Sequence, residues 1–193
     1  MIGSSHTDGH LVVLSAGGTG GHVFPAEALA TELNDRGCRL ALVTDRRGGN
    51  LDGRLGELET HYVRAGGIAG KGGITRILSV GEIVIGILQS RQLLRRLNPS
   101  VVIGFGGYAS VPMMLAATYS STATAIHEQN ALLGRANRLL AVNVQKIATS
   151  FSKMQHIPKQ VQPNVVYTGM PVRASVRALR ETPYPRLTNN NII

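Results

Sequence analysis

The stretch HLVVLSAGGTGGHVFPAEALATELNDRG, which runs from His10 to Gly37, decides the fold. The apolar run His10–Ala16 ends in a row of glycines, which is typical of a buried strand that feeds a glycine-rich turn. Pro25 predicts the start of a helix and Gly37 its end, because proline is favoured at the start of a helix and glycine just beyond its end. A further strand is predicted at Arg39–Thr44. A unit of strand, helix and strand implies parallel strands.

The same alternation continues along the chain. Short apolar runs predict four more strands, at Val101–Phe105, Thr124–His127, Lys146–Ser150 and Val165–Thr168. Helices are expected between them, one from about Ser110 and one over Leu132–Val142. Alternation of this kind predicts an α/β fold, a Rossmann-like parallel sheet with helices on both faces.

Composition suggests how the chain divides into domains. We expect residues 1–9 to be a flexible N-terminus and residues 10–173 to form one Rossmann-like domain. Residues 174–188 contain Thr182-Pro-Tyr-Pro and are interpreted as a helix and linker, and residues 189–193 as the truncated start of a second domain.

The formal net charge of +9 is unevenly distributed. Up to residue 60, five arginines stand against eight acidic residues, whereas fifteen lysines and arginines stand against three glutamates in the remainder. This balance favours an anionic partner such as phosphate, nucleic acid or acidic lipid, and the alternative is a solvated basic surface. The single Cys38 fits a reducing compartment. No signal peptide or spanning apolar run is seen, so a soluble or peripheral protein is expected.

Two glycine loops are the strongest local signals. The loop Gly17–His22 lies between a strand and a helix N-terminus, where free N–H groups favour an anion. Val23 occupies the third glycine position of a dinucleotide fingerprint, and no Walker A lysine follows, so the loop matches neither motif. The loop Gly104–Ser110 joins another strand to a helix. Both loops are expected to open onto one crevice at the carboxyl ends of parallel strands, although a tight turn would also use such glycines.

Five polar side chains, two in these loops and three after later strands, are candidates for chemistry. His22 could take a proton from an attacking hydroxyl, or be structural. Tyr108 could contact a sugar or simply pack. Glu128 lies in the polar run that follows the strand ending at residue 127, and it could accept a hydrogen bond from a sugar hydroxyl or orient a base. Asn130 could bind a ligand or cap the next helix. Arg173 is suited to a diphosphate.

The stretch Ile74–Leu97 has apolar residues at roughly helical spacing, followed by arginines. We expect a helix that covers the sheet. Its exposed edge, with the neighbouring Lys71, could also contact a membrane surface, and both interpretations can hold together.

Four motifs together resemble the MurG family, inverting glycosyltransferases of the two-domain GT-B fold. They are GGTGGHVFPA at Gly17–Ala26, GFGGYAS at Gly104–Ser110, HEQNALLGRANR at His127–Arg138 and GMPVR at Gly169–Arg173. Their order and spacing match the family from Leu11 to Arg173. The resemblance implies an N-terminal, acceptor-side half whose partner domain, the C-terminal donor-binding domain, is missing.

The resemblance implies transfer of N-acetylglucosamine from UDP-N-acetylglucosamine to lipid I, forming lipid II in peptidoglycan synthesis. The reaction would take place at the cytoplasmic face of the bacterial plasma membrane, with an anionic membrane surface as a further partner. No cofactor and no nucleic acid is expected. No metal is expected either, because the sequence holds no Asp-x-Asp pair. Half an enzyme is expected to be inactive alone.

The resemblance also assigns residue roles. His22 would be the general base, and Glu128 is grouped with it as catalytic and as helping to place the acceptor. The substrate-binding residues that it implies are Thr19, Gly20, Gly21, Tyr108, Asn130 and Arg173. Met170 departs from the family's usual asparagine, which puts one polar contact in doubt.

Two other functions stay open from the residues alone. A nicotinamide-dependent oxidoreductase is favoured by Asp45 after the second strand, but the glycine spacing and the HEQN run argue against it. A non-enzymatic peripheral membrane module would explain the basic segment and Ile74–Leu97, and it would leave both glycine loops unexplained.

Overall fold

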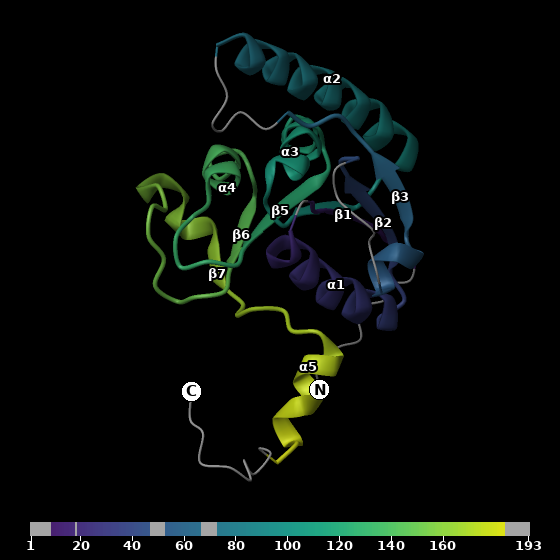
Figure 1. Cartoon of the computed structure of the whole chain (residues 1–193), viewed down its shortest axis with the longest axis vertical. Coiled ribbons are helices and arrows are strands. Elements are labelled where there is room, and N and C mark those ends of the chain that lie inside the picture. The colour runs from purple at the N-terminus through teal and green to yellow at the C-terminus, as the bar shows by residue number, and fades with distance from the viewer. Residues whose placement is uncertain (1–8, 18, 47–52, 67–72, 184–193) are drawn as a thin grey trace, which may run out of the picture.

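The computed structural model describes residues 9–17, 19–46, 53–66 and 73–183, with only the backbone of residues 73–77. A seven-stranded, entirely parallel sheet forms its centre, in the order β3-β2-β1-β4-β5-β6-β7 (Figure 1). The strands are β1 Leu11–Ser15, β2 Arg39–Thr44, β3 Glu59–Tyr62, β4 Val101–Gly104, β5 Ala123–Glu128, β6 Lys146–Thr149 and β7 Val165–Tyr167. The predicted Rossmann-like parallel sheet is therefore confirmed.

Helices cover both faces of the sheet. The α-helices are α1 Gly20–Asp35, α2 Gly73–Leu97, α3 Val111–Thr118, α4 Arg135–Leu140 and α5 Ala174–Ala178, and the 3₁₀ turns are η1 Gly53–Glu57, η2 Tyr108–Ser110, η3 Lys159–Asn164 and η4 Leu179–Glu181. Figure 1 shows α1 on one face and α2, α3 and α4 on the other. The predicted helix in the Ile74–Leu97 stretch is confirmed as α2.

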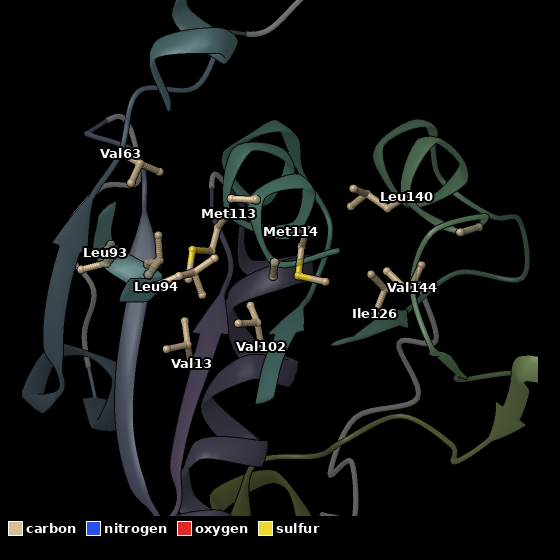
Figure 2. Close-up of a cluster of buried hydrophobic side chains, with 14 of the residues drawn as sticks. Val13, Val63, Leu93, Leu94, Val102, Met113, Met114, Ile126, Leu140 and Val144 are labelled. Atoms are coloured by element: carbon tan, nitrogen blue, oxygen red, sulfur yellow. The ribbon is translucent and has the colours of Figure 1, made fainter. Parts of the chain in front are cut away.

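The strands divide their side chains between two cores. On β1, Val13 faces the cluster beneath α2, α3 and α4, while Val12 and Leu14 face α1. This division follows from the two-residue period of a strand, and it explains why both faces of a parallel strand are apolar. Figure 2 shows the first cluster, in which Met113 and Met114 of α3 lie over the sheet.

Helix α1 begins earlier than predicted. It starts at Gly20, and Pro25 lies inside it. The carbonyl oxygen of Thr19 accepts hydrogen bonds from the N–H groups of His22 (3.0 Å) and Val23 (3.1 Å), so the glycine loop itself winds into the first turn. The prediction that Pro25 opens the helix was wrong because the loop glycines adopt helical geometry before it.

The predicted end of α1 at Gly37 is confirmed. Gly37 has a φ of 79°, and its N–H donates to the carbonyl of Asn34 at 2.9 Å. The N–H of Cys38 donates to the carbonyl of Leu33 at 3.0 Å. These two bonds form a Schellman motif, which favours glycine at this position.

Two further elements, α4 and β3, differ from the sequence prediction. Helix α4 starts at Arg135 rather than Leu132, because Leu132 forms a bridge with Gln155 and the Leu133 N–H donates to the Gln155 carbonyl at 3.1 Å. Strand β3 was not predicted. It lies at the sheet edge with no buried residue, so it carries no apolar run to reveal it.

The chain ends are only partly covered by the structure. After β7 the chain leaves the sheet and forms α5 and η4, within the predicted helix and linker. The expectations for residues 1–8 and 189–193 fall outside the described residues, and the domain division stays a prediction. Among the described residues, no helix is both long enough and apolar enough to cross a membrane.

Candidate active site

The sheet order reverses between β1 and β4, and this is where parallel α/β sheets form a ligand crevice. A cavity of about 620 Å³ lies there, at the carboxyl ends of these strands. Its lining residues are Gly17, Thr19, His22, Asp45, Gly106, Gly107, Tyr108, Ala109, Glu128, Asn130, Gly134, Arg135, Ala136 and Asn137. The prediction that both glycine loops open onto one crevice is confirmed.

The glycines allow the two loops to approach each other closely, and they allow the His22 ring to approach the second loop. A Cβ on Gly17 would overlap the side chain of Ala109 on the second loop. Gly106 and Gly107 have φ values of 88° and 75°, which side chains rarely adopt. A Cβ on Gly106 would lie 3.3 Å from Nδ1 of His22, and one on Gly107 would lie 3.3 Å from its Cδ2. The imidazole therefore packs against the second loop.

His22 belongs to the first turn of α1 and is half-buried. Its Nδ1 is buried and has no hydrogen-bond partner among the residues that the structure describes. A ring held in place by packing, at the wall of a cavity, is suited to exchange a proton with a bound hydroxyl.

The N-terminus of α1 adds a second chemical feature. Thr19 is the N-cap, and its side chain makes no capping hydrogen bond. Within the described part of the chain, the N–H groups of Gly20 and Gly21 have no acceptor. Gly20 and Gly21 lie in the first turn and do not line the cavity wall, whereas Thr19 does. Free N–H groups and the helix dipole make this end of α1 suited to an anion.

Glu128 is 1% exposed and accepts four hydrogen bonds. Its Oε1 accepts from the backbone N–H and the side-chain Nδ2 of Asn130, both at 3.0 Å. Its Oε2 accepts from the Gly134 N–H and Asn137 Nδ2, both at 2.9 Å. The carboxylate thus fixes the loop between β5 and α4 along one side of the cavity.

Asn130 and Tyr108 both line the cavity. Asn130 is exposed, and the N-cap of α4 is Gly134, so the helix-cap interpretation of Asn130 was wrong. The loop runs on through the Leu132 bridge before the helix starts, which separates Asn130 from it.

Two buried residues of the HEQN run have roles that the sequence did not indicate. Nε2 of Gln129 donates to Nδ1 of His127 (3.3 Å) and to the Phe105 carbonyl (2.9 Å), which ties β5 to the second glycine loop. Nε2 of His127 then carries the proton and donates to the Gly169 carbonyl at 3.2 Å. Burial lowers the pKa of His127, while the Gly169 bond and the Glu128 charge oppose that effect.

Arg173 lies away from the cavity. Its guanidinium carbon is 4.0 Å from the centroid of the Phe24 ring, and its Nη1 is 3.8 Å from a carboxylate oxygen of Glu27. Both partners belong to α1. At the family's asparagine position, the sulfur of Met170 accepts a weak hydrogen bond from the Ser150 hydroxyl at 3.6 Å.

A parallel sheet with two glycine loops and a helix N-terminus at its topological switch point defines a Rossmann-like ligand-binding domain. More specifically, the chain belongs to glycosyltransferase family 28, since the family model described as "Glycosyltransferase family 28 N-terminal domain" matches residues 12–149.

Curated relatives agree with this assignment. One from Paramagnetospirillum magneticum is 57% identical over 178 residues, covering 92% of this chain and 48% of the relative. One from Rhodospirillum rubrum is 54% identical over 191 residues, covering 95% of this chain and 49% of the relative. Both are named UDP-N-acetylglucosamine–N-acetylmuramyl-(pentapeptide) pyrophosphoryl-undecaprenol N-acetylglucosamine transferase. The chain spans about half the length of these relatives.

The chain also aligns with solved structures, and each alignment covers about half of the solved chain. The crystal structure of Acinetobacter baumannii MurG is 28% identical, with a TM-score of 0.69, over 92% of this chain and 50% of that one. UDP-GlcNAc 2-epimerase from Neisseria meningitidis is 17% identical, with a TM-score of 0.59, over 90% of this chain and 50% of that one, and it shows likeness of fold alone. The fold is the N-terminal half of a GT-B glycosyltransferase, as predicted.

Membership in this family removes the basis of the oxidoreductase interpretation. Asp45, which had favoured it, is a buried residue at the cavity wall.

Proposed function

We propose that this chain is the acceptor-side half of a transferase that moves N-acetylglucosamine from UDP-N-acetylglucosamine to lipid I. The observation that carries the proposal is the position of His22. Its ring packs against Gly106 and Gly107 at the wall of the cavity of about 620 Å³. The names of the relatives, at 57% and 54% identity, supply the substrates.

His22 acts as the general base in this proposal. The acceptor sugar hydroxyl loses its proton to the imidazole while its oxygen attacks the anomeric carbon. A new C–O bond forms on the face opposite the donor diphosphate, and the bond to UDP breaks with its electron pair leaving on the diphosphate. The configuration of the transferred sugar is therefore inverted.

The N-terminus of α1 stabilises the departing diphosphate. Thr19 and the N–H groups of Gly20 and Gly21, which have no acceptor among the described residues, lie at the positive end of the helix dipole. Asn130 and Arg173 are assigned to the donor, and Arg173 would have to leave Phe24 to reach the cavity. Tyr108 and Glu128 place the acceptor, with Glu128 acting through the loop that it fixes.

Membrane docking is part of the same proposal. Among the α2 side chains that the structure describes, five large apolar ones are exposed, namely Leu78, Val80, Val84, Ile85 and Leu88. Arg91 and Arg95 follow on the same exposed side of the helix. An apolar helix face with basic residues beside it favours an anionic membrane surface, where a lipid-linked acceptor would reside.

The acceptor role is tested by co-sedimentation of the 193-residue chain with anionic vesicles, with and without lipid I. Lipid I should raise binding, and His22→Ala and Glu128→Ala should reduce that increase. A folded chain that binds both kinds of vesicle equally would contradict the proposal.

The base role needs a complete enzyme, because the chain alone is expected not to transfer sugar. A hybrid of this chain with the C-terminal half of the P. magneticum relative supplies one. His22→Ala should lower kcat by about 10²–10⁴-fold. The control is His156→Asn, since His156 is exposed and its φ of 62° suits asparagine. Full activity of His22→Ala would remove His22 from this role.

A further inference from the structure

A second cavity, of about 330 Å³, adjoins the candidate active site. It lies beyond the carboxyl ends of β2 and β3, against α2. Asp45 lines both cavities, so they share a wall. The second cavity is mainly polar, and its other polar residues are Arg46, Tyr62, Arg64, Glu82 and Gln89.

Helix α2 forms one wall of this cavity, and close backbone packing holds that wall in place. A Cβ on Gly86 would overlap the Arg64 carbonyl oxygen, and a Cβ on Gly66 would overlap the Ser79 carbonyl oxygen. The Arg64 N–H donates to the side-chain oxygen of Gln89 at 2.9 Å. The helix and the segment after β3 therefore hold one spacing, and the cavity between them is preformed.

The cationic groups of this cavity are available to a ligand. Arg46 is exposed and makes no ion pair or hydrogen bond with any residue in the described part of the chain. Arg64 pairs with Glu82 at 3.3 Å, with both side chains about half exposed. An exposed pair of this kind is weak, so a ligand carboxylate can compete for Arg64.

We propose that this second cavity holds the peptide arm of the acceptor, with Arg46 and Arg64 pairing with a carboxylate of that arm. The inference rests on the proposed function, in which the muramyl sugar occupies the first cavity. A peptide joined to that sugar through its amino end carries a free carboxylate at its other end. Arginine binds carboxylates through two parallel hydrogen bonds, and Tyr62 and Gln89 offer partners to peptide amides.

Calorimetric titration of the 193-residue chain tests the proposal with two short-chain acceptors. One carries N-acetylmuramyl-pentapeptide on the lipid diphosphate, and the other lacks the peptide. The peptide-bearing acceptor should bind about tenfold more tightly, the effect of one good charge-assisted contact. The double variant Arg46→Ala, Arg64→Ala should lose that advantage and bind the peptide-free acceptor as the native chain does.

A matched control is the double variant Arg36→Ala, Arg54→Ala. It removes the same charge from arginines that form ion pairs outside both cavities, and it should leave both affinities unchanged. Glu82→Gln should raise the affinity for the peptide-bearing acceptor a few fold, because it frees Arg64.

Two outcomes would overturn the inference while leaving the proposed function intact. One is equal affinity for the two acceptors. The other is that the double variant binds both acceptors more weakly than the native chain, by the same factor. This result would mean that the arginines attract the diphosphate. Failure of the folded chain to bind either acceptor would overturn the proposed function, and this inference with it.

Discussion

Glu128 shows at the scale of one residue how a candidate catalytic group can also be structural. Its two carboxylate oxygens accept from Asn130, Gly134 and Asn137. Glu128→Gln would turn one oxygen into an amide NH₂ facing two donors. We expect a loss of about 2–4 kcal/mol in the free energy of unfolding, measured by urea denaturation.

The control for Glu128 is Glu57→Gln, which breaks only the exposed pair with Arg54 and should cost less than about 1 kcal/mol. If Glu128→Gln keeps its stability but loses acceptor binding, then Glu128 acts directly on the substrate and the positioning role is wrong.

His127 provides a pH-dependent prediction. Its pKa is lowered by burial, so between its folded-state pKa and its ordinary value of about 6.5 the unfolded chain binds the proton first. The free energy of unfolding should therefore fall as the pH decreases through this window, by at most about 1.4 kcal/mol per pH unit from this group.

Thermal or urea unfolding between about pH 5 and pH 8 measures this slope. His127→Gln removes the titrating group, and its curve should be flatter than that of the native chain over the same window. Parallel curves for the two proteins would contradict the assignment of a neutral, buried His127.

At the scale of elements, α2 contains two glycines with opposite expected effects. Gly86→Ala places a Cβ against the Arg64 carbonyl oxygen and should destabilise the chain by about 1–3 kcal/mol. Gly81→Ala meets nothing within 4 Å and should stabilise it by about 0.5–1 kcal/mol, through helix propensity.

The two alanine variants control for each other, because both replace glycine by alanine inside the same helix. Urea unfolding gives both values. If Gly86→Ala were as stable as Gly81→Ala, α2 would not be held closely against the segment after β3, and the preformed second cavity would lose its support.

The sequence predicted best the strands that contain an apolar run, including β7, which lies at a sheet edge and has no buried residue. Apolar runs located β1, β2, β4, β5, β6 and β7 to within about a residue or two. Strand β3 lies at the edge and alternates weakly, so its pattern carries no such signal. The start of α4 was wrong because a bridge to Gln155 competes with helix formation, and local spacing does not report a partner more than twenty residues away.

At the scale of the whole molecule, the exposed apolar face of α2 leads to a prediction about membranes. Leu78→Ser with Leu88→Ser should lower partitioning onto anionic vesicles by about tenfold or more, because these side chains would be buried in lipid. Co-sedimentation measures the partition coefficient, and higher salt should lower it further through the arginines.

A matched control places the same change elsewhere. Leu179 is 64% exposed, the same fraction as Leu78, and Val176 is also exposed. Leu179→Ser with Val176→Ser should leave partitioning unchanged. If the two double variants lowered the partition coefficient equally, exposed apolar side chains in general, rather than the α2 face, would govern membrane binding.

The sequence by itself determined the parallel α/β fold, the family and the place of the two glycine loops. These properties depend on local patterns, namely apolar runs, glycines with special backbone angles and motifs in a fixed order. The assignment of His22 and Glu128 to one cavity also followed, because carboxyl ends of parallel strands share an edge.

Only the tertiary structure decided what each side chain touches. It seats His22 on Gly106 and Gly107, surrounds Glu128 with four donors and places Arg173 on Phe24 outside the cavity. The second cavity likewise exists only because α2 packs against the segment after β3. Such contacts join residues far apart in the chain, and their geometry depends on how helices and strands pack rather than on any local pattern.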